Sequence, residues 1–212
     1  EITHMTFTQA LAYQPTKGTF SMDGMTSFEQ ADDLTLIWKV RPGMTFHNGD
    51  PVTAEDVVYS WNRLSEIYDL TGGTHVSRPG FAYWDNLEAI DNETVVEHWA
   101  KPSAGAPIHR SRHYYSFINK AVAESDGNNA GDYIDIQAAP FGVGSGPYTI
   151  AEASPEGTRL VRRPDYWNHS PADDGFVEGD PYIDEVVTRI IPDKEAVRAA
   201  WEAGDMDVYG AI

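Results

Sequence analysis

The chain has 212 residues, no cysteine and a formal net charge of −18, from 33 acidic and 15 basic residues. This balance disfavours nucleic acid and anionic membrane surfaces as partners, and the lack of cysteine excludes disulfides and thiolate chemistry. Hydrophobic residues make up 41% of the sequence, and no run approaches the ~20 apolar residues of a membrane span. We therefore expect a folded protein without a cofactor, which its charge keeps monomeric.

The N-terminal stretch combines apolar residues with a turn rich in proline, glycine and threonine. Met5, Phe7, Leu11 and Tyr13 give it an amphipathic start, and the turn follows at residues 14–19. We predict a helical start followed by short extended segments.

Residues 34–64 predict a strand, tight turns and a capped helix. Residues 34–40 alternate in the period-two pattern of a strand with one buried face, and Gly43 supplies the positive φ of a type II turn. A helix is expected to begin at Thr53, whose hydroxyl can cap the backbone N–H of Asp56. Its apolar face consists of Val57, Trp61 and Leu64.

The next segment predicts a hairpin with strands at residues 86–90 and 93–99. The second strand mixes polar and apolar residues on both faces, which is typical of an edge or half-exposed strand. Residues 101–107 are a linker, and residues 109–125 predict one helix or two short ones.

Residues 141–147 are the clearest break in composition, with three glycines at alternating positions. Glycine lets the backbone cross between layers at little steric cost, so we place a domain boundary here and expect a flexible crossing. Beyond it, residues 148–152 and 158–163 predict a second hairpin.

The C-terminal part predicts a strand at residues 185–191, a helix capped by Asp193 and ended by Gly204, and a strand from Val208. Strand, helix and strand of these lengths are typical of a βαβ unit with parallel pairing. Trp201 lies on the apolar stripe of the helix. We expect Trp38, Trp61 and Trp201 to be core residues.

Three long segments carry a resemblance to a known family. They read RPGMTFHNGDPVTAEDVVYSW, VGSGPYTIAEASPEGTRLVRRPDYW and DEVVTRIIPDKEAVRAAWEAGDMDV. In this order and spacing they resemble the bacterial solute-binding proteins that serve oligopeptide, dipeptide and nickel ABC transporters. Members of that family are much longer, so the chain resembles an internal piece of one.

The resemblance implies an α/β fold, a fragment of a periplasmic-binding-protein-like (type II) lobe with a smaller α+β domain. Residues 1–140 would form the smaller domain and residues 141–212 part of the first ligand-binding lobe, with the second lobe absent. The implied function is non-enzymatic capture of a peptide or small solute between two lobes, followed by delivery to a membrane permease. The implied location is periplasmic or extracellular, with any lipid anchor outside this chain.

The resemblance also implies where the ligand would be contacted. In the family, the loop after the capped helix brings an aromatic side chain towards the ligand, and the strand after the GDMDV-like turn runs along the cleft. The predicted ligand-binding residues are Tyr68, Phe81, Tyr83, Trp84, Tyr209, Gly210 and Ala211.

Other motifs favour a site only weakly. His109 and His113 would share one face of a helix, but a metal centre needs a third ligand and the arginines between them would repel a cation. Ser145 lies between two glycines without completing G-x-S-x-G. Acidic residues at 173–180, and Asp205 with Asp207, are cation candidates, but charged residues in such loops are more often simply solvated. A carboxylate-dependent hydrolase and a ligand-free interaction module remain the rival functions.

Overall fold

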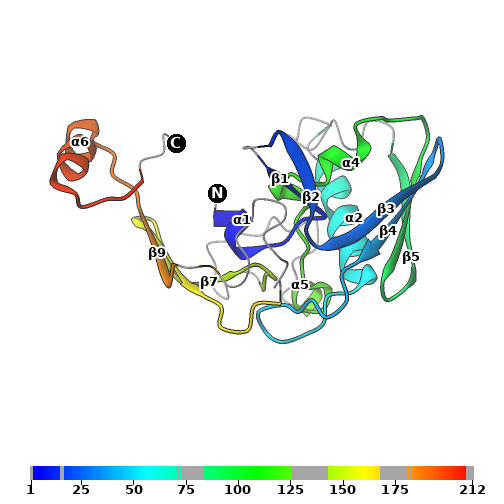
Figure 1. Cartoon of the computed structure of the whole chain (residues 1–212), viewed down its shortest axis with the longest axis horizontal. Coiled ribbons are helices and arrows are strands. Elements are labelled where there is room, and N and C mark those ends of the chain that lie inside the picture. The colour runs from blue at the N-terminus through cyan, green and yellow to red at the C-terminus, as the bar shows by residue number, and fades with distance from the viewer. Residues whose placement is uncertain are drawn as a thin grey trace.

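A computed structural model describes residues 2–14, 17–70, 72, 84–125, 143–167, 181 and 183–208. In Figure 1 the residues up to 125 gather into one part, which we call the body. Residues 143–208 form a second part, which we call the arm and which extends away from the body. The main hydrophobic core lies in the body.

The body is built on a four-stranded antiparallel sheet in the order β3-β4-β6-β5. The helix α2 packs against β5 and β6 (Figure 1), and a short hairpin of β1 and β2 lies beside the sheet. The strands and first helix are α1 (Ile2–Thr6), β1 (Leu11–Gln14), β2 (Thr19–Met22), β3 (Met25–Asp32), β4 (Thr35–Val40), β5 (Trp84–Asp91) and β6 (Thr94–Trp99).

The helix α2 (Ala54–Leu70) begins where the sequence predicts it. Thr53 and Asp56 form the expected capping box: the Thr53 backbone N–H donates to Asp56 Oδ2 at 2.9 Å, and the Asp56 N–H donates to Thr53 Oγ1 at 3.4 Å. Trp61 is fully buried, and its ring meets that of Trp38 edge to face at 5.9 Å. The turn prediction is also confirmed, since Gly43 has φ 77°.

The prediction that the 93–99 strand is an edge or half-exposed strand is wrong, since four of the six residues of β6 are buried. β6 lies between β4 and β5. Its polar residue Glu97 is fully buried because it has partners: Arg110 donates to Glu97 Oε1, and Trp38 Nε1 donates to Glu97 Oε2 at 2.8 Å. The Arg110 guanidinium also lies 4.5 Å from the ring centroid of Trp61. A buried ion pair therefore explains the polar residue that suggested exposure.

The segment 106–125 is more broken than predicted. It forms α4 (Ala106–His109), the 3₁₀ turn η1 (His113–Tyr115) and α5 (Lys120–Ser125). The tight packing of Tyr115 and Phe117 into the core fixes the chain between the two helices.

The arm carries a three-stranded antiparallel sheet in the order β7-β8-β9 and the helix α6. Asp193 caps α6 by accepting from the Ala196 N–H at 2.8 Å, and Gly204 ends it in the left-handed conformation, as predicted. The bounds are β7 (Tyr148–Ser154), β8 (Gly157–Arg162), β9 (Glu185–Arg189) and α6 (Lys194–Ala203).

Trp201 is 51% exposed, so the prediction that it is a core residue is wrong. The spacing of apolar residues in a helix shows which face is apolar, but it does not show whether another element packs on that face. Trp38 and Trp61 are buried as predicted. Of the predicted strand from Val208, only Val208 itself is among the described residues. The predicted parallel pairing involves that strand, so it stays a prediction.

Candidate functional site: the junction of body and arm

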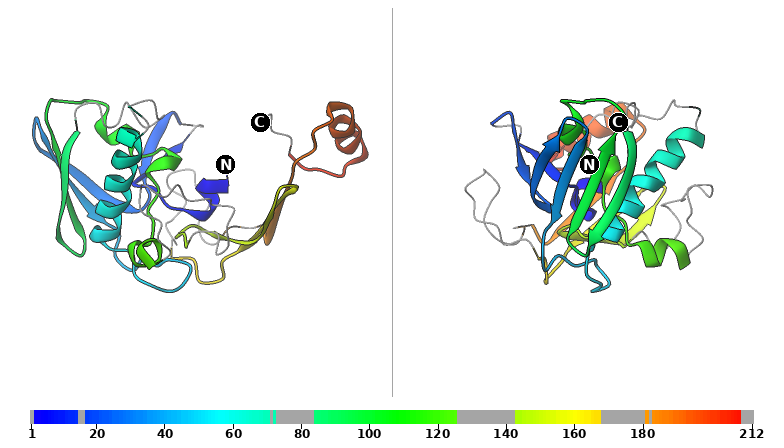
Figure 2. Two further views of the ribbon diagram at one scale, coloured as in Figure 1. Left: turned by 180° about the vertical axis from the view of Figure 1, so that it is seen from behind. Right: turned by 90° about the vertical axis from the view of Figure 1, so that its right-hand side faces the viewer.

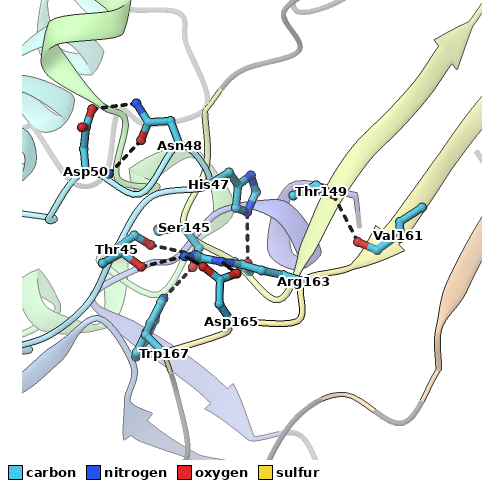
Figure 3. A network of polar contacts seen from close by, with 11 residues as sticks. Thr45, His47, Asn48, Asp50, Ser145, Thr149, Val161, Arg163, Asp165 and Trp167 are labelled. Carbon is cyan, nitrogen blue, oxygen red and sulfur yellow. Dashed lines mark hydrogen bonds and ion pairs between the residues drawn. The ribbon is translucent and has the colours of Figure 1, made fainter.

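A network of polar contacts joins the body to the start of the arm (Figure 3). The loop between β4 and α2 supplies Thr45 and His47. The residues before β7 supply Ser145, and the segment after β8 supplies Arg163 and Trp167. We call this network, together with Gly144, Gly146 and Asp165, the junction.

Gly144 and Gly146 are required because two backbones approach each other closely. The segment runs against α1, and the Gly146 N–H donates to Thr6 O at 3.0 Å. A Cβ at Gly144 would lie 1.9 Å from Thr6 O, and one at Gly146 would lie 2.6 Å from Met5 O. Neither glycine has a positive φ. Glycine therefore serves close packing here and not conformational freedom.

His47 bridges the loop and the glycine segment. Its backbone N–H donates to Gly144 O at 2.8 Å, and its Nε2 lies 3.0 Å from Gly146 O. A carbonyl oxygen only accepts, so Nε2 carries the proton in this contact. Burial lowers the pKa of His47, which the Gly146 contact opposes. The ring is therefore held as a neutral donor.

Arg163 ties the arm to the body through two bonds to one residue. Its Nη1 donates to Thr45 O at 2.8 Å and its Nη2 to Thr45 Oγ1 at 2.6 Å. Its Nε donates to Asp165 Oδ1 at 2.9 Å, and this contact lowers the pKa of Asp165. Arg163 is only 2% exposed, so the fork is shielded from solvent.

Ser145 is fully buried and takes part through its backbone. Trp167 Nε1 donates to Ser145 O at 2.6 Å. The Ser145 hydroxyl has no hydrogen-bond partner among the described residues. A buried hydroxyl is a poor nucleophile for a dissolved substrate, and the Nε2 proton of His47 is already committed to Gly146. The junction is built to hold segments together.

These contacts do not fit the flexible crossing that the glycines suggested. Residues 144–146 are buried and bonded on both sides, to α1 and to the loop before α2. The sequence signal was correct in marking the place where two parts meet. It missed Thr45, His47 and Arg163, which lie in the segments TFHNG and RRPDYW but have no spacing typical of a site.

Of the seven predicted ligand-binding residues, two lie among the described residues. Tyr68 lies near the C-terminal end of α2, and Trp84 is the first residue of β5. Trp84 is half-buried, packs against the main core and pairs in register with Trp99. The other five, Phe81, Tyr83, Tyr209, Gly210 and Ala211, lie outside the described residues.

The surface hollows among the described residues include two that are lined by both polar and apolar side chains. One, of about 320 Å³, lies between α2, β5 and α5 and is lined by both cations and carboxylates, including Arg63, Lys120 and Glu55. The other, of about 700 Å³, lies at the strand ends and is lined by Asp85 and Trp99 among others. Because Asp85 follows Trp84 directly, the second hollow adjoins the predicted ligand region.

The predicted metal candidates are not brought together. His109 lies in α4 and His113 in η1, so they do not share a helix face. The His113 ring instead meets the His4 ring edge to face, with the centroids 5.7 Å apart. The acidic residues 173–180 lie outside the described residues. Within the described ranges, no group of three histidine, aspartate or glutamate residues could hold a metal ion. Among the described helices, none has the length and apolar character needed to cross a bilayer.

The sequence profile of the bacterial extracellular solute-binding proteins, family 5 Middle, matches residues 19–212. The oligopeptide-binding protein AppA of Bacillus subtilis is 25% identical over 178 residues, which is 81% of this chain and 29% of AppA. A probable ABC transporter-binding protein of Deinococcus radiodurans is 23% identical and covers 94% of this chain, which spans 34% of that relative. The chain is therefore about a third as long as these relatives.

Solved structures share the fold at low sequence identity. The Haemophilus influenzae OppA complex with the peptide RPPGFSPFR has a TM-score of 0.76 and 23% identity, covering 97% of this chain and 40% of that one. Helicobacter pylori DppA in complex with the peptide STSA has a TM-score of 0.75 and 20% identity, covering 95% and 40%. These neighbours show that the α/β fold is that of a type II periplasmic binding protein, as a fragment.

Proposed function

The chain belongs to the bacterial extracellular solute-binding proteins of family 5, and we propose that it is part of the substrate-binding component of an ABC importer. In this role the protein captures peptides or similar small solutes and delivers them to a membrane permease. The observation that carries the proposal is the family match over residues 19–212, supported by relatives named as oligopeptide-binding proteins.

The proposed mechanism is capture between two lobes. Residues 1–140 act as the smaller domain and residues 141–212 as part of the first ligand-binding lobe. The junction supports this arrangement because Arg163 and His47 join body and arm through shielded hydrogen bonds, so that the two move as one unit. The second lobe is contributed outside these residues. Closure about a hinge between the lobes excludes water from the solute and creates the surface that binds the permease.

Ligand contact is proposed for the aromatic residues around the start of β5 and for the residues after α6. The hollow of about 700 Å³ supports the first location, because it is lined by Asp85, which follows Trp84 in the sequence, and by Trp99, which pairs with Trp84 in the sheet. Tyrosine and tryptophan offer flat, rigid contact area with a polar tip, which suits a peptide of varied side chains, and ordered water can fill the remaining space. The proposed contacts are Tyr68, Phe81, Tyr83, Trp84, Tyr209, Gly210 and Ala211.

In the proposed function, the protein binds the solute and catalyses no reaction on it. Membership of a family of solute-binding proteins supports this, and so does the engagement of His47 and the burial of Ser145 in packing. The protein acts outside the cytoplasmic membrane, in the periplasm or extracellularly, and any lipid anchor that tethers it to the membrane lies outside this chain.

The test is native mass spectrometry of a protein that carries these residues within a chain of its relatives' length. We expect peptide-sized masses that stay bound through purification and are released unchanged on denaturation. The 212-residue chain is the matched control, and it should retain little or no cargo because the second lobe is missing. Bound masses that turn out to be hydrolysis products would contradict the proposal.

A further inference from the structure

Two segments of this acidic chain contain no aspartate or glutamate. They are residues 2–22 and 98–123, and together they carry lysines, arginines and histidines. The two segments lie against each other in the body, where the Phe117 backbone N–H donates to Thr8 O at 2.9 Å. A region without carboxylates of its own therefore forms where they meet, although the chain as a whole has 33 acidic residues.

Three histidines and an arginine gather in this region. His4 lies in α1, His109 in α4, and Arg112 directly precedes His113 of η1. The His4 and His113 rings are in edge-to-face contact. His4, Arg112 and His113 are exposed, and His109 is half-buried. We call these four residues the basic patch. Since α1 lies between the body and the arm (Figure 2) and packs against the glycines of the junction, the basic patch adjoins the junction.

The positive charge of the basic patch is not neutralised by neighbouring carboxylates. Burial lowers the pKa of His109 and of His113, and the charge of Arg112 lowers both further. The remaining charged groups that act on these two rings are cationic as well, including Arg110 for His109 and His4 for His113. No ion pair joins Arg112 to a carboxylate within the part of the chain that the structure describes. Arg112 is therefore an exposed cation that has room for an anionic partner.

The donors of the basic patch suit a carboxylate. A guanidinium offers parallel N–H groups in a planar fork that matches the two oxygens of a carboxylate. His4 Nδ1 lies 2.8 Å from Gln9 Oε1, which only accepts, so Nδ1 carries a proton and Nε2 is the nitrogen that can take up a second one. The net charge of −18 repels an extended anionic surface such as a membrane, so a small solute is the fitting partner.

We propose that the basic patch binds a carboxylate group of a small solute, with Arg112 as the main contact. The inference rests on the proposed function only in taking this carboxylate as part of the captured solute. The two can fail separately. Loss of carboxylate binding at Arg112 leaves capture of other solutes intact, whereas a receptor that captures nothing still has a measurable anion site.

The test is a titration of the 212-residue chain with succinate at constant ionic strength, followed through the NMR signals of the histidine rings. We expect saturable shifts of His4 and His113, with an affinity too weak to survive purification. The ring of His98, which already pairs with Glu88, is the internal control and should not shift. Succinamide has the same carbon chain without the charges and should cause no shift. Bound succinate should also raise the pKa of His113, because a nearby negative charge favours the imidazolium.

Substitutions at Arg112 show whether binding occurs at the basic patch. Arg112→Gln should weaken succinate binding about tenfold, and Arg112→Lys, which keeps the charge but loses the planar fork, should lie between this variant and the wild type. Arg198→Gln makes the same charge change on α6, at the outer end of the arm (Figure 1), and should leave binding unchanged. Shifts that do not saturate, an equal response to succinamide, or binding that Arg112→Gln leaves unaffected would overturn the proposal.

Discussion

At the scale of single residues, the ion pair of Glu97 and Arg110 has the clearest energetic consequence. Both side chains are fully buried, and the guanidinium lies 4.4 Å from the ring of Tyr115 and 4.5 Å from that of Trp61. A buried charge is tolerated only while its partner remains, because desolvation removes its hydration. The stability of the body therefore depends on Glu97, at a position where strand patterning alone suggests an exposed residue.

Replacement of Glu97 by alanine should lower the free energy of unfolding by about 3–5 kcal/mol, because it leaves Arg110 buried without a counter-charge. Urea denaturation measures this change. The control is Glu88→Ala on the neighbouring strand, which removes an exposed contact to His98 and should cost no more than about 1 kcal/mol. If both variants lose the same free energy of unfolding, the buried ion pair contributes no more to stability than the exposed contact.

Asp23 gives the body a pH dependence of defined sign. Burial raises its pKa from 3.8 to about 6, against the contacts with the Gln9 N–H and Arg41. Between these two values the folded state binds a proton that the unfolded state does not, so this group stabilises the fold less as the pH rises through 6. Asp23→Asn should raise the unfolding free energy by about 1–2 kcal/mol at pH 8, and the gain should vanish below pH 4.

Urea denaturation at several pH values measures this difference. The matched control is Asp33→Asn, at an exposed position, where the change should stay within about 0.5 kcal/mol. A gain for Asp23→Asn that is the same at pH 4 and pH 8 would contradict the assignment.

At the scale of elements, local signals predicted best. The cap at Thr53, the apolar face of α2 and the end of α6 at Gly204 depend on residues within a few positions of each other, and all three are confirmed. The order of the sheet depends on distant residues. β6 lies in the middle, where Glu97 is buried and paired with Arg110. No periodicity within the strand contains that information.

The glycines of the junction show the same limit. Alternating glycines correctly marked the meeting of two parts, but composition does not distinguish a mobile crossing from a crowded one. The crowding comes from α1, more than a hundred residues earlier in the sequence, whose Thr6 carbonyl lies against Gly144. The bonding residues Thr45 and Arg163 were missed for the same reason, since their contact joins segments 118 positions apart.

Gly144→Ala should destabilise the protein by about 2–3 kcal/mol, because a Cβ would lie 1.9 Å from Thr6 O and the backbones would have to separate. Gly105→Ala is the matched control: its Cβ would meet nothing closer than His109 Nε2 at 3.5 Å, and the cost should stay within about 0.5 kcal/mol. Thermal unfolding compares the two. If Gly144→Ala proves as mild as Gly105→Ala, the junction is not closely packed.

At the scale of the whole molecule, the α/β class and the family could be predicted from three long sequence segments, and the family match over residues 19–212 confirms them. Whether another element packs on the apolar face of α6 could not be predicted from the sequence. Trp201 lies on a well-formed helical stripe, yet it is 51% exposed because no described element packs on that face. The chain spans only 29–34% of its curated relatives, so its surface is not a guide to theirs.

The central claim is that these residues belong to a receptor that holds a peptide or a similar small solute without altering it. It is tested most directly by the thermal midpoint of a relative-length protein containing them, measured with and without a peptide pool, with the pool analysed by mass spectrometry afterwards. We predict a higher midpoint and unchanged peptides, because a ligand that binds only the folded state must stabilise it. Cleaved peptides, or a midpoint that no peptide raises, would contradict the claim.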